Sequence, residues 1–178
     1  MKTDIISIDN KGKGFKEAIE VTKVAAQFKD LKYKDSIKLQ LCTEELLSMA
    51  RSITGEMEGD FWVECDDEKF ELTLSTQTVM DKEKRQTLIS ASSNKRNEAA
   101  TSFLGMLRDS FEQAMLADTD STFYELPNDV ASDVVGQYVE DPEWDRYEQS
   151  VLRRIADDIK ISIRGGKVLM VVTKLICR

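Results

Sequence analysis

The sequence contains no histidine, and its three cysteines lie far apart with no C-x-x-C pair. Zinc sites are built from closely spaced cysteines and histidines, so we expect no metal site of this kind. Catalysis by an imidazole base is excluded for the same reason. Cys42, Cys65 and Cys177 are interpreted as reduced thiols, two of them within apolar patterns.

Long apolar runs are also missing. No segment approaches the roughly 20 apolar residues that span a bilayer, and the start, MKTDIISID, lacks a basic region followed by an apolar core. We therefore expect a cytoplasmic protein with no membrane partner. The net charge is −8, and the basic residues gather only weakly, so no nucleic-acid partner is expected.

The clearest pattern that the sequence does contain is the stretch from Asp35 to Gly55. Its apolar residues recur at helical spacing, which predicts a buried amphipathic helix. Asp35 or Ser36 is expected to cap the start, and Gly55 to end the helix in a left-handed conformation. The predicted inward stripe consists of Leu39, Cys42, Leu46, Met49, Ala50 and Ile53.

Patterns of period 2 and 3.6 predict the other elements. Strands are expected at 3–9, 61–65, 70–75, 159–163 and 168–176, and helices at 15–31, 81–91, 98–117 and 143–157. Such an order favours an α+β fold, a two-layer sandwich with helices on one face of a mixed β-sheet. We expect a single domain over residues 1–178, with a helical and acidic insertion at 79–142.

Two segments carry a resemblance to a known family: ELLSMARSITGE at 45–56 and RRIADDIKISIRGGKVLMVVTKLI at 153–176. With the order of the elements, they resemble the GHKL (Bergerat) ATPase domain, and in particular the cytoplasmic anti-sigma-factor serine kinases. The resemblance implies a histidine-kinase-like ATPase fold in which the insertion replaces the ATP lid.

The resemblance also implies where nucleotide chemistry would lie. Glu45 stands at the position of the general base, with Glu44 as a neighbouring candidate, and Met49 stands where the family has a magnesium-binding Asn. A thioether is too soft a ligand to replace that amide oxygen. Thr76 stands in place of the adenine-binding Asp, and Thr78 in place of the first glycine of that motif.

The family's third site, a glycine-rich segment before the last helix, has no counterpart, since no glycine lies between Gly136 and Gly165. The acidic residues Asp145 and Glu148 would repel phosphates there. We therefore expect no cofactor and no metal, with Glu45 as a vestigial base and Met49, Thr76 and Thr78 as degenerate positions of the nucleotide site.

These observations favour a regulator that acts by protein–protein binding without ATP hydrolysis. The resemblance implies a sigma factor or its antagonist as the partner, and a homodimer. Phe103, Leu107 and Phe111 of the insertion are expected to fill the emptied pocket. The acidic stretch 118–145 is either a docking surface for a basic partner or a solvated loop.

Two alternatives remain open at this point. One is a divergent serine/threonine protein kinase that binds ATP and magnesium and uses Glu45 together with another ligand such as Asp81. The other is an α+β protein of unknown role whose likeness to the family is only architectural.

Overall fold

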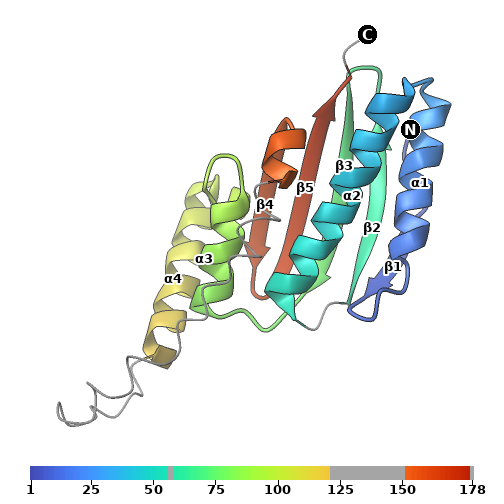
Figure 1. Ribbon diagram of the computed structural model, residues 1–178. Helices are drawn as coiled ribbons and strands as arrows, with labels where there is room; N and C mark the ends of the chain where they lie inside the picture. Colours follow the sequence, from blue (N-terminus) through green and yellow to red (C-terminus); the bar gives the residue numbers. More distant parts are fainter. Residues whose placement is uncertain (56–57, 121–150, 177–178) are drawn as a thin grey trace.

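The computed structural model describes residues 1–55, 58–120 and 151–176. They form an α+β fold in which helices lie on one face of a five-stranded sheet (Figure 1). The strands are β1 (Ile6–Asp9), β2 (Glu58–Cys65), β3 (Lys69–Gln77), β4 (Asp158–Arg164) and β5 (Lys167–Leu175). The helices are α1 (Phe15–Phe28), α2 (Tyr33–Thr54), α3 (Lys82–Ala91), the 3₁₀ turn η1 (Glu98–Ala100) and α4 (Phe103–Asp120), and residues 151–155 are also helical.

The sheet has the order β1-β2-β3-β5-β4, and all the pairings between these strands are antiparallel. The prediction of a mixed sheet is therefore wrong for the described strands. The hairpins β2–β3 and β4–β5 have tight turns, which join only antiparallel strands. The two hairpins then meet through β3 and β5, where Leu72 pairs with Val172, again antiparallel.

The core lies between α2 and the sheet. All six residues of the predicted inward stripe of α2 are buried, which confirms that prediction. From the sheet, Phe61, Val63 and Leu72 are fully buried and belong to the same core cluster. Alternate residues of a strand point to opposite faces, so the polar residues between them face away from the helices.

The two ends of α2 differ from each other in how well the sequence predicts them. Gly55 ends the helix, as expected, with a positive φ of 72°, and its N–H donates to the carbonyl of Arg51 at 3.1 Å; its ψ of −83° differs from that of the predicted left-handed conformation. The start lies earlier than predicted: Lys32 is the N-cap residue, and no side chain caps the helix. Asp35 and Ser36 already lie in the first helical turn, so the predicted cap is wrong.

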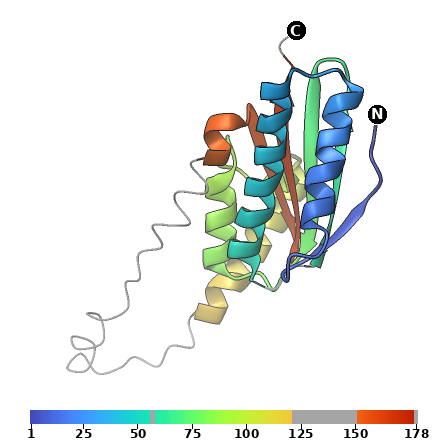
Figure 2. The same cartoon turned by 45° about the vertical axis from the view of Figure 1, so that its right-hand side comes forward.

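Helix α1 packs beside α2 through small residues. Ala18, Ala25 and Ala26 are fully buried, and the Thr22 hydroxyl lies 2.9 Å from the Thr43 hydroxyl of α2. Figure 2 shows α1, α2 and α3 side by side on the same face of the sheet. Phe28, the last residue of α1, is 68% exposed.

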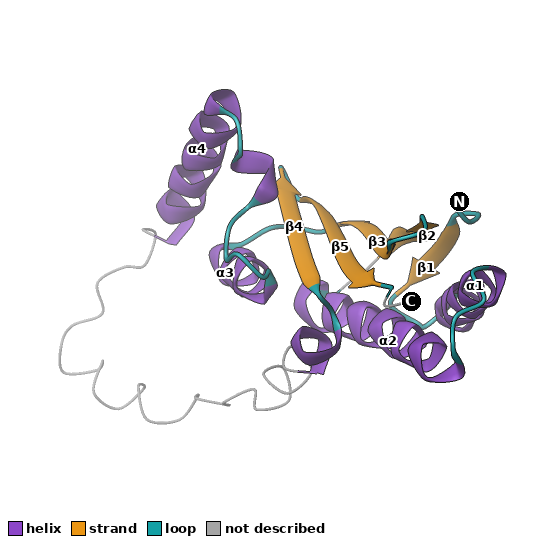
Figure 3. Cartoon of the chain, turned by 90° about the horizontal axis from the view of Figure 1, so that it is seen from above, coloured by secondary structure: helices purple, strands orange, loops and turns teal. Residues whose placement is uncertain are grey.

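The described part of the insertion begins with α3, which contacts both α2 and β4. Its Leu88 is fully buried, and the Asp81 side chain caps its start by accepting a hydrogen bond from the N–H of Lys84 at 2.7 Å. Viewed from above, α4 lies beyond the β4 edge of the sheet (Figure 3). The rest of the predicted acidic stretch, residues 121–145, lies outside the described residues.

Side chains between α3 and η1 complete the free edge of β4. Ser93 exchanges two hydrogen bonds with the backbone of Ile159, at 2.8 and 2.9 Å. The Asn97 amide does the same with the backbone of Ile163, accepting at 2.8 Å and donating at 3.1 Å. These two residues satisfy backbone groups that an edge strand would otherwise leave unpaired.

The helix predicted at 98–117 forms as η1 and α4, but the prediction for its apolar side chains is wrong. Phe103, Leu107 and Phe111 are 76%, 60% and 65% exposed, so they fill no pocket. The place beside α2 on the sheet is taken by α3 instead (Figure 3). Among the described residues, no helix has both the length and the apolar character needed to cross a bilayer.

Candidate functional site

The two positions predicted on α2 lie one turn apart in different surroundings. Met49 is 1% exposed and belongs to the core cluster, so its sulfur contacts apolar groups. Glu45 is half-buried. A residue that is sealed in the core offers no ligand atom to a solvated cation, since magnesium keeps several waters and prefers oxygen ligands.

The two positions predicted at the end of β3 are used in hydrogen bonds within the chain. Thr76 is 3% exposed, and its hydroxyl donates to the carbonyl of Glu58 at 3.0 Å. The Thr78 hydroxyl donates to the carbonyl of Thr54, the last residue of α2, at 3.2 Å. These hydroxyls therefore join β3 to its neighbours.

The fold brings the end of β3 to the end of α2, but it does not gather all four predicted residues at one cavity. Thr78 contacts Thr54, whereas Met49 lies about 7 Å and Glu45 about 13 Å further along the helix axis. Neither Glu45 nor Met49 lines any of the five main cavities of the described residues. Thr76 and Thr78 each line one of these five cavities, and the two cavities are different.

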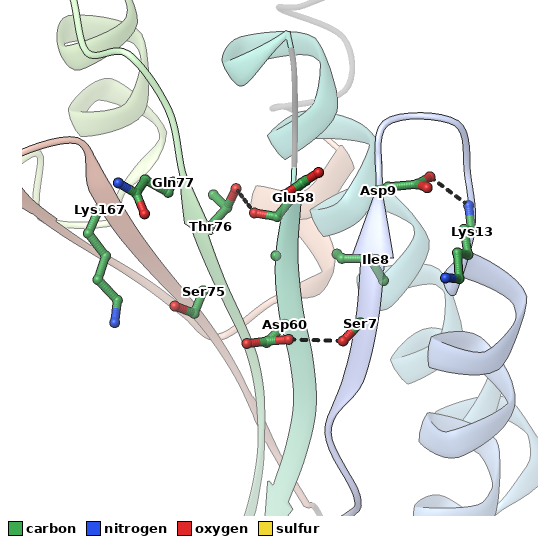
Figure 4. Close-up of a pocket in the computed structure, with 11 residues that line it drawn as sticks. Ser7, Ile8, Asp9, Lys13, Glu58, Asp60, Ser75, Thr76, Gln77 and Lys167 are labelled. Atoms are coloured by element: carbon green, nitrogen blue, oxygen red, sulfur yellow. Dashed lines mark hydrogen bonds between the residues drawn. The ribbon is translucent and has the colours of Figure 1, made fainter.

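The largest of these cavities, about 530 Å³, lies at one end of the sheet (Figure 4). It is lined by Ser7, Ile8, Asp9, Lys13, Glu58, Gly59, Asp60, Ser75, Thr76, Gln77 and Lys167. Three carboxylates and two lysines face solvent there, so no charge is buried. The sequence gives no sign of this hollow, because polar residues alternating along strands are normal for a solvated face.

The chemistry that this hollow offers is limited. The Ser7 hydroxyl lies 3.2 Å from a carboxylate oxygen of Asp60, and Asp9 accepts hydrogen bonds from the N–H groups of Lys11 and Lys13 at 2.9 and 3.1 Å. The Ser7–Asp60 pair has no base of the strength that activated serines require. Asp9 shapes the β1–α1 turn, since its side chain is bonded to backbone groups.

Other chemically reactive groups are also placed unfavourably. Burial raises the pKa of the Cys42 thiol to about 12, and burial likewise raises the pKa of Cys65, so both stay protonated and unreactive at neutral pH. Both are free and buried, which confirms the prediction for these two, and Cys177 lies outside the described residues. Asp81, the alternative metal ligand, is the N-cap of α3. Over the described ranges, no cluster of three or more acidic or cysteine side chains is arranged to hold a metal ion.

Comparison with known proteins adds no relative to this picture. No protein-family model matches the chain, and no curated protein matches it. The resemblance to the GHKL ATPases therefore stays a prediction from the residues.

Proposed function

We propose that this chain is a regulatory protein that acts by binding another protein, on a histidine-kinase-like ATPase fold that has lost nucleotide chemistry. The observation that carries the proposal is the burial of Met49 at the position where the family needs a magnesium ligand. The α+β arrangement, with helices over one face of the sheet, supports the proposal, whereas the antiparallel pairing of the described strands departs from the mixed sheet that was expected.

The state of the adenine position supports the same conclusion. Thr76 is buried, and its hydroxyl donates its one hydrogen bond to the carbonyl of Glu58. In the family, a carboxylate at this position accepts the adenine amino proton. Replacing a charged acceptor by a neutral hydroxyl costs a ligand roughly 1.5–3 kcal/mol, which is one to two decades of affinity.

The position of α3 is a further support. This helix lies beside α2 on the sheet and contacts β4, and its Leu88 is fully buried. Opening the space beside α2 would expose that side chain at a cost of about 1.5–3 kcal/mol. A nucleotide would have to overcome this cost in addition to the lost contacts at Met49 and Thr76.

Calorimetric titration with ATP and Mg²⁺ tests the loss of nucleotide chemistry. We expect no binding heat at millimolar ATP, with a working kinase of the same family as the positive control. Micromolar binding that disappears on adding a chelator would overturn this half of the proposal. Phosphate transfer to a partner, abolished in Glu45→Ala, would then assign the chain to the active kinases.

Affinity capture from the native cell tests the binding half. We propose a sigma factor or its antagonist as the partner, as the resemblance implies. The expected result is a stoichiometric complex that forms equally well with and without ATP and Mg²⁺. A complex that needs the nucleotide would contradict the proposal.

A further inference from the structure

Helix α4 is attached to the rest of the chain by polar contacts. A carboxylate oxygen of Asp109 is bonded to the guanidinium of Arg85, whose side chain is only 5% exposed. The same oxygen accepts a hydrogen bond from the Asn97 amide at 2.5 Å. One turn later, the carboxylate of Glu112 accepts from the N–H of Gly165 at 3.3 Å.

Gly105 continues this inward side of α4 toward the start of the helix. A Cβ atom there would lie 2.4 Å from the carbonyl oxygen of Ala99, so the helix approaches η1 more closely than any other residue permits. Gly105, Asp109 and Glu112 are spaced by four and three residues, which places them on one side of a helix. The inward side of α4 is therefore small and charged.

The opposite side of α4 is apolar and exposed. The α4 stripe, as we define it, consists of Phe103, Leu104, Leu107, Phe111 and Met115, which are 59–76% exposed. Helices on globular proteins show the reverse, with the apolar side inward. The five side chains offer roughly 500–600 Å² of apolar surface, as large as the largest patch on a typical monomer.

We propose that the α4 stripe is a self-association surface, on which a second copy of this chain packs its own α4 in antiparallel orientation. A standard interface buries about 800 Å² on each partner, so the stripe supplies most of what a stable dimer needs. A two-fold axis at the level of Asp109 places Phe103 opposite the partner's Met115 and Leu107 opposite the partner's Phe111. Each aromatic ring then meets a flexible or branched aliphatic group, and large side chains fill the length of the contact.

The charges around the stripe do not oppose a second copy. Between Phe103 and Met115 the charged residues are Arg108, Asp109 and Glu112. Arg108 pairs with Glu112 at 2.8 Å, and Asp109 pairs with Arg85. Because these charges are compensated within the chain, two copies of α4 can meet without bringing uncompensated like charges together.

Sedimentation of the full chain tests this inference, which goes beyond the proposed function and is independent of nucleotide binding. We expect a dimer at micromolar concentration, and a monomer for the double variant Leu107→Asp and Phe111→Asp, with association weakened at least 100-fold. The matched control is Phe28→Asp, since Phe28 is exposed to a similar extent, 68%, but lies on α1. The control is expected to remain a dimer.

Three outcomes would overturn the inference. The first is a wild-type chain that is monomeric at micromolar concentration. If the α4 stripe is protected from solvent in that monomer, its occupant is the segment 121–150 of the same chain and not a second copy. A dimer that survives the double variant, or one that Phe28→Asp dissociates, would place the interface elsewhere. If the double variant does not fold by circular dichroism, Leu107→Gln keeps helix propensity and is expected to weaken the dimer at least tenfold; unchanged affinity would count against the proposal.

Discussion

Helices α2 and α4 show similar apolar spacing, yet the apolar side of α2 faces the core and the apolar side of α4 faces solvent. On α2 the apolar residues are buried against the sheet, and polar residues face solvent. On α4 the carboxylates of Asp109 and Glu112 face inward, and the large apolar residues are exposed. Periodicity shows that a helix has an apolar side, but it does not show whether that side meets the chain's own core or another molecule.

Asp109→Ala is expected to have the largest effect, because it removes the contact that holds α4. Breaking one partner of a buried ion pair costs about 3–5 kcal/mol, since Arg85 is left buried and unpaired. Hydrogen exchange should show faster exchange across α4 while the amides of α2 keep their protection. Equal acceleration in both helices would mean that α4 and α2 belong to one cooperative unit.

The matched variant at this position is the double change Arg85→Met and Asp109→Leu. It removes both charges and keeps approximately the same side-chain volume. Replacing a buried ion pair by apolar residues is often neutral or stabilising. Recovery of most of the lost stability would confirm that the cost of Asp109→Ala lies in the unpaired charge rather than in the absent contact.

The variants Met49→Ala in α2 and Leu107→Ala in α4 compare the two helices directly. Because Met49 is buried in the core, truncation leaves a cavity and is expected to lower the free energy of unfolding by about 2–5 kcal/mol. Leu107→Ala, measured at dilutions where the chain is monomeric, is expected to change it by less than about 0.5 kcal/mol. Urea unfolding measures both; a larger cost for Leu107→Ala would place the α4 stripe within the core of the monomer.

A smaller effect than that of Met49→Ala is expected at Asp157, a partly exposed polar contact near the start of α2. Burial alone would raise the pKa of Asp157, but hydrogen bonds from Lys174 at 2.9 Å and the N–H of Leu175 at 2.8 Å outweigh it and hold the pKa below its usual value. The stabilisation is therefore present above about pH 4 and is lost as the pH falls through the lower folded-state pKa.

We expect Asp157→Asn to cost roughly 0.5–1 kcal/mol at pH 7, after allowance for screening, and to flatten the loss of stability below about pH 4. Thermal unfolding as a function of pH measures this. The double variant with Lys174→Met separates the ion pair from the backbone contact. An unchanged acid profile in Asp157→Asn would show that other carboxylates govern the acid limb.

The parts of the fold that depend on local signals could be predicted from the sequence. The inward stripe of α2, the ending of α2 at Gly55 and the two hairpins follow from spacing and turn residues a few positions apart. The direction of the β3–β5 pairing could not be predicted, because it joins segments about 100 residues apart and no local pattern encodes it. The start of α2 at Lys32 was missed because the helix uses no side-chain cap there.

The candidate site was predictable only in part. The buried state of Met49 follows from its place in the apolar stripe, and the structure agrees. That the Thr76 hydroxyl donates to Glu58 depends on the β2–β3 register, which sequence patterns do not give in enough detail. The exposure of Phe103, Leu107 and Phe111 was missed because the residues that hold α4, Arg85 and Asn97, lie in other segments of the chain.

The amide of Asn97 and the hydroxyl of Ser93 have a consequence for how this sheet can grow. Together with the backbone N–H of Ser93, they pair the outward backbone groups of Ile159 and Ile163, so the β4 edge already has hydrogen-bond partners at these two residues. A peptide seeking to join as a sixth strand would have to displace them. The opposite edge, at β1, is only four residues long, so edge-to-edge pairing with another chain is restrained at both edges by different means.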